Sequence, residues 1–86
     1  MISRMYAIKD ELSGFSYPIP LPSDRDAKAW FQEKMINTKV MLDNPNDFAL
    51  YYIGTYDTES ATFIQHPSKD IKEIKKGVER NERSNS

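Results

Sequence analysis

The stretch from residue 44 to residue 63, NPNDFALYYIGTYDTESATF, decides the fold that we expect for this chain of 86 residues. Its alternation predicts a strand with apolar side chains on both sides: Phe48, Leu50 and Tyr52 on one side, Ala49, Tyr51 and Ile53 on the other. A strand that is apolar on both sides is typical of the centre of a sheet. Gly54 indicates a twist, a bulge or a close approach, and the polar residues 57–60 predict a turn into a further strand over 61–65.

A first hairpin is predicted near the N-terminus. Residues 4–10 have the composition of a strand, and the following ELSG ends at Gly14, which tolerates the positive φ of a turn. The next segment, FSYPIPLP over residues 15–22, alternates with period two but contains three prolines. Proline cannot donate a ladder hydrogen bond, so we expect an edge strand or an extended polyproline arm rather than a central strand. Protection of the sheet edge is the expected use, and a ligand for a proline-recognising domain is the alternative.

One helix is predicted over residues 24–36. Ser23 and Asp26 form a capping box, and an apolar stripe at helical spacing follows, made of Ala27, Trp30, Phe31 and Met35. This stripe should pack on the sheet, with Trp30 in the core rather than stacked on a base.

The C-terminal part is predicted to contain a short helix, because Ile71, Ile74 and Val78 are spaced at i, i+3 and i+7. Residues 78–86 have almost nothing to bury, so we expect one domain over residues 1–77 and a disordered tail. The predicted fold class is α+β: two hairpins in the order ββαββ form a small antiparallel sheet, with one helix packed on a face.

Composition narrows the classes of function. The chain has no cysteine, no apolar run long enough to span a bilayer and no apolar region typical of a secretory signal, so we expect a cytoplasmic protein that does not enter a membrane. A domain this small often gains stability by self-association, which makes a homodimer plausible. The single histidine, His66, and the absence of catalytic or metal-binding spacings favour a protein that is not an enzyme and needs no cofactor or metal.

The net charge is −1, which argues against a strongly cationic DNA-condensing protein. Residues 1–68 contain six basic and nine acidic residues, whereas residues 69–86 contain six basic and four acidic ones. Any contact with DNA phosphates would therefore be local. The candidate contacts are the tyrosines Tyr6, Tyr51, Tyr52 and Tyr56 for stacking, and the cations Arg4, Lys9, Lys72, Lys75 and Lys76 for phosphates. Tyr51 and Tyr52 point to opposite sides of their strand, so at most one of them belongs to the stacking surface.

Three segments carry a resemblance to a known family: MYAIKDELSGF near the N-terminus, AWFQ in the predicted helix and NPNDFALYYIGTYDTESA. Over about residues 5–65 the chain resembles the small nonstructural protein of gokushoviruses, single-stranded-DNA phages of the microvirus family. The resemblance implies a DNA-binding protein of the host cytoplasm that acts when single-stranded genomes are replicated or packaged. It implies no catalytic residue.

Two functions are compatible with these observations. The first is binding of single-stranded DNA, without strong sequence preference, by an α+β homodimer. The second is a protein–protein adaptor whose aromatic face docks on a replication initiator, a host replication factor or a procapsid, which fits the low net charge better.

Overall fold

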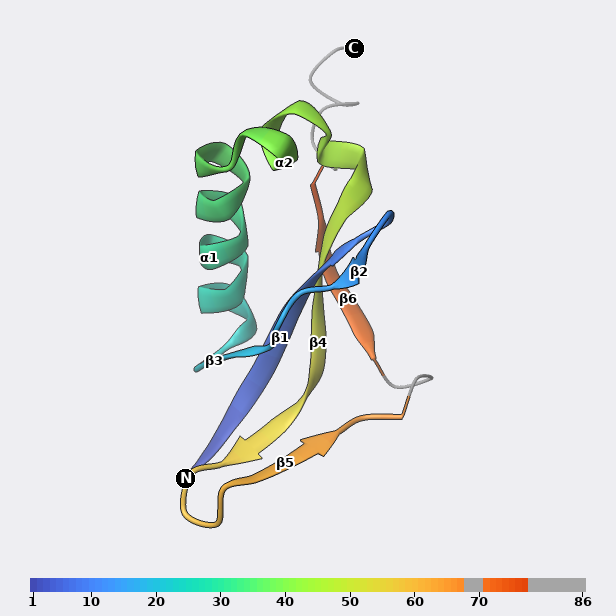
Figure 1. Ribbon diagram of the computed structural model, residues 1–86. Helices are drawn as coiled ribbons and strands as arrows, with labels where there is room; N and C mark the ends of the chain where they lie inside the picture. Colours follow the sequence, from blue (N-terminus) through green and yellow to red (C-terminus); the bar gives the residue numbers. More distant parts are fainter. Residues whose placement is uncertain (68–70, 78–86) are drawn as a thin grey trace.

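The centre of the fold is a pair of long antiparallel strands, β1 (Ile2–Asp10) and β4 (Phe48–Asp57) (Figure 1). The computed structural model describes residues 1–67 and 71–77, and β4 has neighbours on both sides, as its apolar pattern predicted. The predicted α+β fold class with an antiparallel sheet is confirmed.

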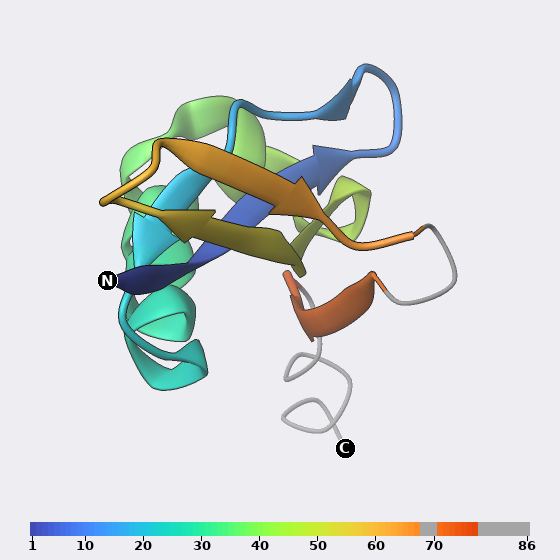
Figure 2. The same ribbon diagram turned by 90° about the horizontal axis from the view of Figure 1, so that it is seen from below.

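Two short strands flank each central strand. On the outer side of β1 lie β2 (Gly14–Phe15) and β3 (Ile19–Leu21). On the outer side of β4 lie β5 (Thr62–Gln65) and β6 (Lys72–Lys76), which pair with opposite halves of the strand and diverge from each other (Figures 1 and 2). The sheet therefore has six strands but is only four strands wide at any level.

The helices form a single layer beside the sheet (Figure 1). Helix α1 (Asp24–Asn37) begins after Ser23, whose Oγ accepts a hydrogen bond from the amide of Asp26, so the predicted cap is confirmed. A short helix α2 (Lys39–Asp43) and a 3₁₀ turn η1 (Pro45–Asp47) then return the chain to β4. Neither α1 nor any other described helix is long and apolar enough to cross a membrane.

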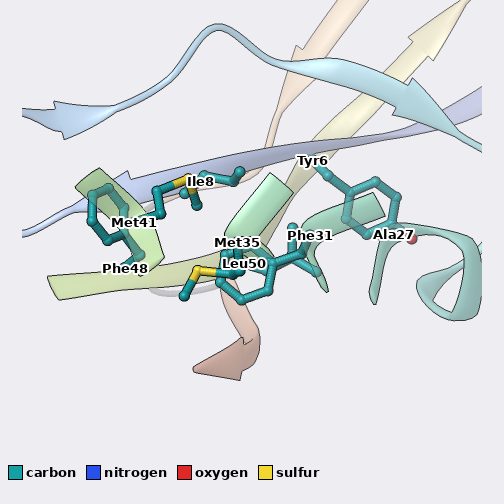
Figure 3. Close-up of a cluster of buried hydrophobic side chains, with 8 residues drawn as sticks. All are labelled: Tyr6, Ile8, Ala27, Phe31, Met35, Met41, Phe48 and Leu50. Carbon is teal, nitrogen blue, oxygen red and sulfur yellow. The ribbon is translucent and has the colours of Figure 1, made fainter. Parts of the chain in front are cut away.

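The main core fills the space between the sheet and the helices (Figure 3). Its buried members come from both layers: Tyr6, Ile8, Ala27, Phe31, Met35, Met41, Phe48 and Leu50. The predicted stripe of α1 is correct at three of its four positions. Trp30 differs, since it is only partly buried at the margin of this core, whereas the neighbouring Phe31 is fully buried. The prediction that Trp30 is a core residue is therefore corrected: Phe31 is the central aromatic residue of the helix.

The two edges of the sheet are built differently. Edge strand β3 carries Pro20 and is followed by Pro22, so the interpretation of the proline segment as an edge strand is confirmed. The opposite edge, β5, has no proline and no charged residue, pairs with β4 alone among the described strands, and exposes Phe63 and Ile64. Strand β3 is therefore protected by proline, whereas β5 is open.

The predicted C-terminal helix is wrong. Residues Lys72–Lys76 form strand β6 along β4, and the chain then continues to Gly77, whose amide donates to the carbonyl of Phe48. A β-bulge at Ile74 lets this side chain reach the main core, which is the role that helical spacing had suggested for it. The predicted tail, residues 78–86, lies outside the described residues.

A second β-bulge lies in the middle of β4. Met5 pairs with Gly54 and Tyr6 with Tyr52, so Ile53 is the additional residue. A Cβ atom on Gly54 would lie 2.3 Å from the carbonyl oxygen of Ile64, which explains why glycine stands here. Because the bulge changes the alternation, Tyr56 projects to the side of the sheet that faces away from the helices.

Candidate nucleic-acid interface

The two faces of the sheet differ in what covers them. The helices cover one face, and we call the other the open face. Its floor is a small cluster of Met5, Ala7 and Ile53, against which Tyr51, Tyr56 and Ile71 pack. Tyr51 and Tyr56 are therefore supported from below by buried residues, which holds their rings in place.

One pair of aromatic rings on the open face is in direct contact. The rings of Phe15 and Tyr51 meet edge to face, with centroids 5.4 Å apart and an interplanar angle of 82°. Phe15 is 48% exposed, and the Nζ of Lys9 lies 5.7 Å from the centre of its ring. This arrangement places an exposed aromatic surface next to a cation.

A second aromatic pair lies towards the other end of the same face. Tyr56 of β4 is directly opposite Phe63 of β5, and residues in direct register project to the same side of a sheet. Phe63 is 42% exposed. The open face thus presents aromatic side chains from three strands, β2, β4 and β5.

The charges near Tyr51 are mixed. Its hydroxyl lies 3.4 Å from Oε1 of Glu73, which is also 3.6 Å from the Nζ of Lys76. Burial, followed by the nearby Glu73 carboxylate, raises the pKa of Tyr51, so its phenol stays neutral at physiological pH. Lys76 is opposite Ala49 and therefore belongs to the open face together with Lys9, and the carboxylates of Glu73 and Glu11 both act on Tyr51.

Three of the predicted contacts lie on the helix-covered face instead. Tyr6 is fully buried, so the exposed ring expected at this position is not present. Its hydroxyl donates to Oδ1 of Asp24 at 2.5 Å and accepts from the Nε of Arg4 at 2.7 Å. Arg4 also forms an ion pair with Asp24 at 2.9 Å, and its guanidinium lies 4.0 Å from the ring centre of Tyr52. These contacts attach the start of α1 to the sheet.

The pKa values of this cluster reflect its geometry. Burial raises the pKa of Tyr6 to about 12, and its hydrogen bond to Asp24 acts in the same direction. The hydrogen bond from Tyr6, followed by that from Arg4, lowers the pKa of Asp24. The cluster therefore contains a neutral phenol between a carboxylate and a guanidinium.

The remaining two predicted cations are also on the helix-covered side. Lys72 is opposite Tyr52 and Lys75 is opposite Leu50, and both partners project towards the helices. The structure therefore divides the predicted contacts into two groups. Lys9, Tyr51, Tyr56 and Lys76 lie on the open face, whereas Arg4, Tyr6, Tyr52, Lys72 and Lys75 do not. Tyr51 and Tyr52 do point to opposite sides, as the sequence indicated.

The sequence analysis missed Phe15 and Phe63 as candidate contacts. The sequence does contain a signal for both, since Phe15 follows the turn glycine of one hairpin and Phe63 lies in the return strand of the other, and each is therefore placed beside a central strand. Their place on the open face depends on the hairpin registers, which pair Phe15 with Lys9 and Phe63 with Tyr56.

Comparison with known proteins identifies a family. A family model described as Phage ORF5 protein matches residues 3–79, a range that includes both helices and nearly all of the sheet. No curated protein and no solved structure matches the chain.

Proposed function

Because the chain belongs to the Phage ORF5 protein family, we propose that it is a nonstructural phage protein that binds single-stranded DNA during genome replication or packaging. The family match supports a phage protein, and the resemblance to the gokushovirus protein supports the narrower assignment. In this proposal the protein acts in the host cytoplasm as a binding protein and not as an enzyme.

The observation that carries the proposal is the supported aromatic pair on the open face. Phe15 and Tyr51 offer ring surface beside Lys9, and a second pair follows at Tyr56 and Phe63. Aromatic side chains on an uncovered sheet are the usual platform for stacking unpaired bases, because every base has a flat face. Stacking of this kind has no strong sequence preference.

The charges predict weak binding with a shallow salt dependence. Lys9 and Lys76 are the two open-face cations that we assign to phosphates, and Lys76 is already paired with Glu73. Two phosphate contacts on a single strand correspond to a slope of about −1.4 in log K against log salt concentration. Stacking must then provide most of the affinity, at about 1–3 kcal/mol per base.

Fluorescence anisotropy with labelled oligothymidylate at two salt concentrations tests this proposal. We expect Phe15→Ala to weaken binding by about 1–3 kcal/mol, since Phe15 is exposed and belongs to a two-residue strand. Leu12→Ala is the matched control, because Leu12 is 87% exposed in the adjacent turn and is not aromatic.

Two double variants of equal charge test the assignment of the face. Lys9→Ala with Lys76→Ala should weaken binding and flatten the salt dependence, whereas Lys72→Ala with Lys75→Ala should leave both almost unchanged. Equal effects of the two pairs would contradict the open face as the binding surface. If the folded protein shows no affinity for oligothymidylate at low salt, single-stranded DNA is not its ligand.

A specific observation favours the adaptor as the second candidate function. Strand β5 is an open edge with exposed Phe63 and Ile64. The net charge of −1 is small, so the partner need not carry a particular charge. In this case the partner is a replication initiator, a host replication factor or a procapsid protein. Ile64→Lys should then abolish capture of that partner while leaving DNA affinity unchanged.

A further inference from the structure

A groove lies on the helix-covered side, between the first hairpin with its proline arm and the helices. Its volume is about 460 Å³, which is within the range of about 300–1,000 Å³ typical of ligand sites. Buried core residues form its base, among them Ile8, Met41 and Phe48. Trp30 of α1 lines it on one side, and residues of the hairpin arm, among them Tyr17, line it on the other. The groove therefore has an apolar base and an indole on its helix side.

Hydrogen-bond donors lie along one side of this groove. Trp30, Lys34 and Thr38 follow one another at intervals of four residues, which places them in one row along the helix and into its C-cap. None of these three side chains has a hydrogen-bond or ion-pair partner among the residues that the structure describes. The row offers an indole N–H, an ammonium group and a hydroxyl to a ligand that carries acceptors.

We propose that this groove holds one unstacked nucleotide of the bound strand, with its base against Trp30 and its acceptors on the donor row. The proposal rests on the proposed function and extends it from the open face to a second surface. Strand β2 connects the two, because the ring of Phe15 contacts Tyr51 on the open face and the residues of this strand also line the groove. A strand that leaves the aromatic pair can therefore pass over the β2 edge and enter the groove.

The chemistry favours a nucleotide over the apolar side chain of a protein partner. Base carbonyl oxygens, ring nitrogens and phosphate oxygens are all acceptors and match the donor row. An apolar side chain would desolvate these donors without replacing their bonds to water, which costs free energy. The flat indole of Trp30 also suits a base better than a branched aliphatic group.

The charge of the groove limits the role of the phosphate. Asp10 lines it together with Lys34, so the two formal charges cancel. The Asp10 carboxylate is already engaged in the hairpin turn, where it accepts from the Leu12 amide and the Ser13 hydroxyl, both at 3.0 Å. Stacking on Trp30 is therefore the main contribution to binding in the groove, and Lys34 supplies orientation and a smaller part of the affinity.

Trp30 is the only tryptophan of the chain, so its fluorescence reports on the groove directly. We would titrate the protein with oligothymidylate and, separately, with thymidine monophosphate, and record anisotropy of the labelled oligonucleotide on the same samples. Both ligands should quench Trp30, and Lys34→Ala should weaken each quenching curve about three- to tenfold. Lys28→Ala is the matched control, since Lys28 is an exposed lysine of α1 that does not line the groove, and it should behave as wild type.

The outcomes separate this proposal from the proposed function. If the oligonucleotide binds by anisotropy but neither ligand quenches Trp30, the groove proposal is overturned while the open face retains its function, and the groove is left to a protein side chain. Equal weakening by Lys34→Ala and Lys28→Ala would also overturn it. Quenching by the mononucleotide without oligonucleotide binding would support the groove and contradict strand binding on the open face.

Discussion

Removal of the Tyr6 hydroxyl should loosen the attachment of α1 to the sheet. In the folded chain this hydroxyl donates to Asp24 and accepts from Arg4, two charged groups whose own ion pair would remain in a Tyr6→Phe variant. Hydrogen bonds to charged groups contribute about 1.5–3 kcal/mol. The side chains of Arg4 and Asp24 are 39% and 44% exposed, so water can replace the lost bonds in part. We therefore expect a loss of about 1.5 kcal/mol near neutral pH.

The pH dependence of this loss is the more specific prediction. Burial raises the pKa of Tyr6 from 10.0 to about 12 in the folded chain. A phenol whose pKa is higher in the folded chain than in the unfolded chain stabilises the fold fully at pH values below the unfolded pKa. This stabilisation is lost as the pH rises from about 10 to about 12. At about pH 11 the unfolded phenol is mostly ionised and the folded one mostly neutral, which removes about 1.4 kcal/mol from the wild-type free energy of unfolding. The Tyr6→Phe variant has no phenol at this position, so its free energy of unfolding does not fall through this ionisation.

Urea unfolding followed by circular dichroism at about pH 7 and about pH 11 measures both quantities. The difference between wild type and Tyr6→Phe should fall by about 1.4 kcal/mol between the two values of pH. Tyr17→Phe is the control, because Tyr17 is 92% exposed, and it should match wild type at both. A difference that stays constant with pH would refute the reasoning, since Tyr6 would then not be a buried phenol held neutral by the fold.

Three further predictions concern packing and assembly. Phe31→Ala should lower the free energy of unfolding in urea by about 3–5 kcal/mol and Trp30→Ala by clearly less, because Phe31 is fully buried and Trp30 only partly. A larger loss for Trp30→Ala than for Phe31→Ala would show that Trp30 is the core residue. Gly54→Ala should cost about 1–3 kcal/mol, since its Cβ would meet the Ile64 carbonyl oxygen at 2.3 Å, and an unchanged unfolding midpoint would show that β5 shifts freely. Sedimentation should show a dimer that Ile64→Lys converts to a monomer, because the lysine places a charge on the open edge; a wild-type monomer would contradict pairing through β5.

The central part of the fold was predictable because its local signals agree with one another. The apolar alternation of residues 48–53, the capping box at Ser23 and the glycine at the end of the first turn each point to the element that forms. Gly14 does adopt a positive φ, of 94°. Each of these signals depends only on neighbours along the chain.

The parts that failed depend on partners that are distant in sequence. Ile71 and Ile74 have helical spacing, yet residues 72–76 form a strand because β4 offers an unpaired edge there, and pairing outweighs a weak local preference. Trp30 and Phe31 are adjacent in the same apolar stripe, and only the position of the sheet decides which of them is fully buried. The division of the candidate contacts between two faces likewise depends on strand registers and on the bulge at Ile53.

The contrast between the two edges of the sheet limits how copies of this chain can assemble. An edge-to-edge polymer needs two compatible edges on every subunit, so that each copy can continue the row. Here Pro20 has no amide hydrogen to offer on β3, whereas β5, with neither proline nor a charged residue, presents unblocked backbone groups to a neighbour. When two copies pair through β5, each uses the same strand, and the assembly closes at two with a twofold axis between the strands. Self-pairing through β5 therefore ends in a finite particle.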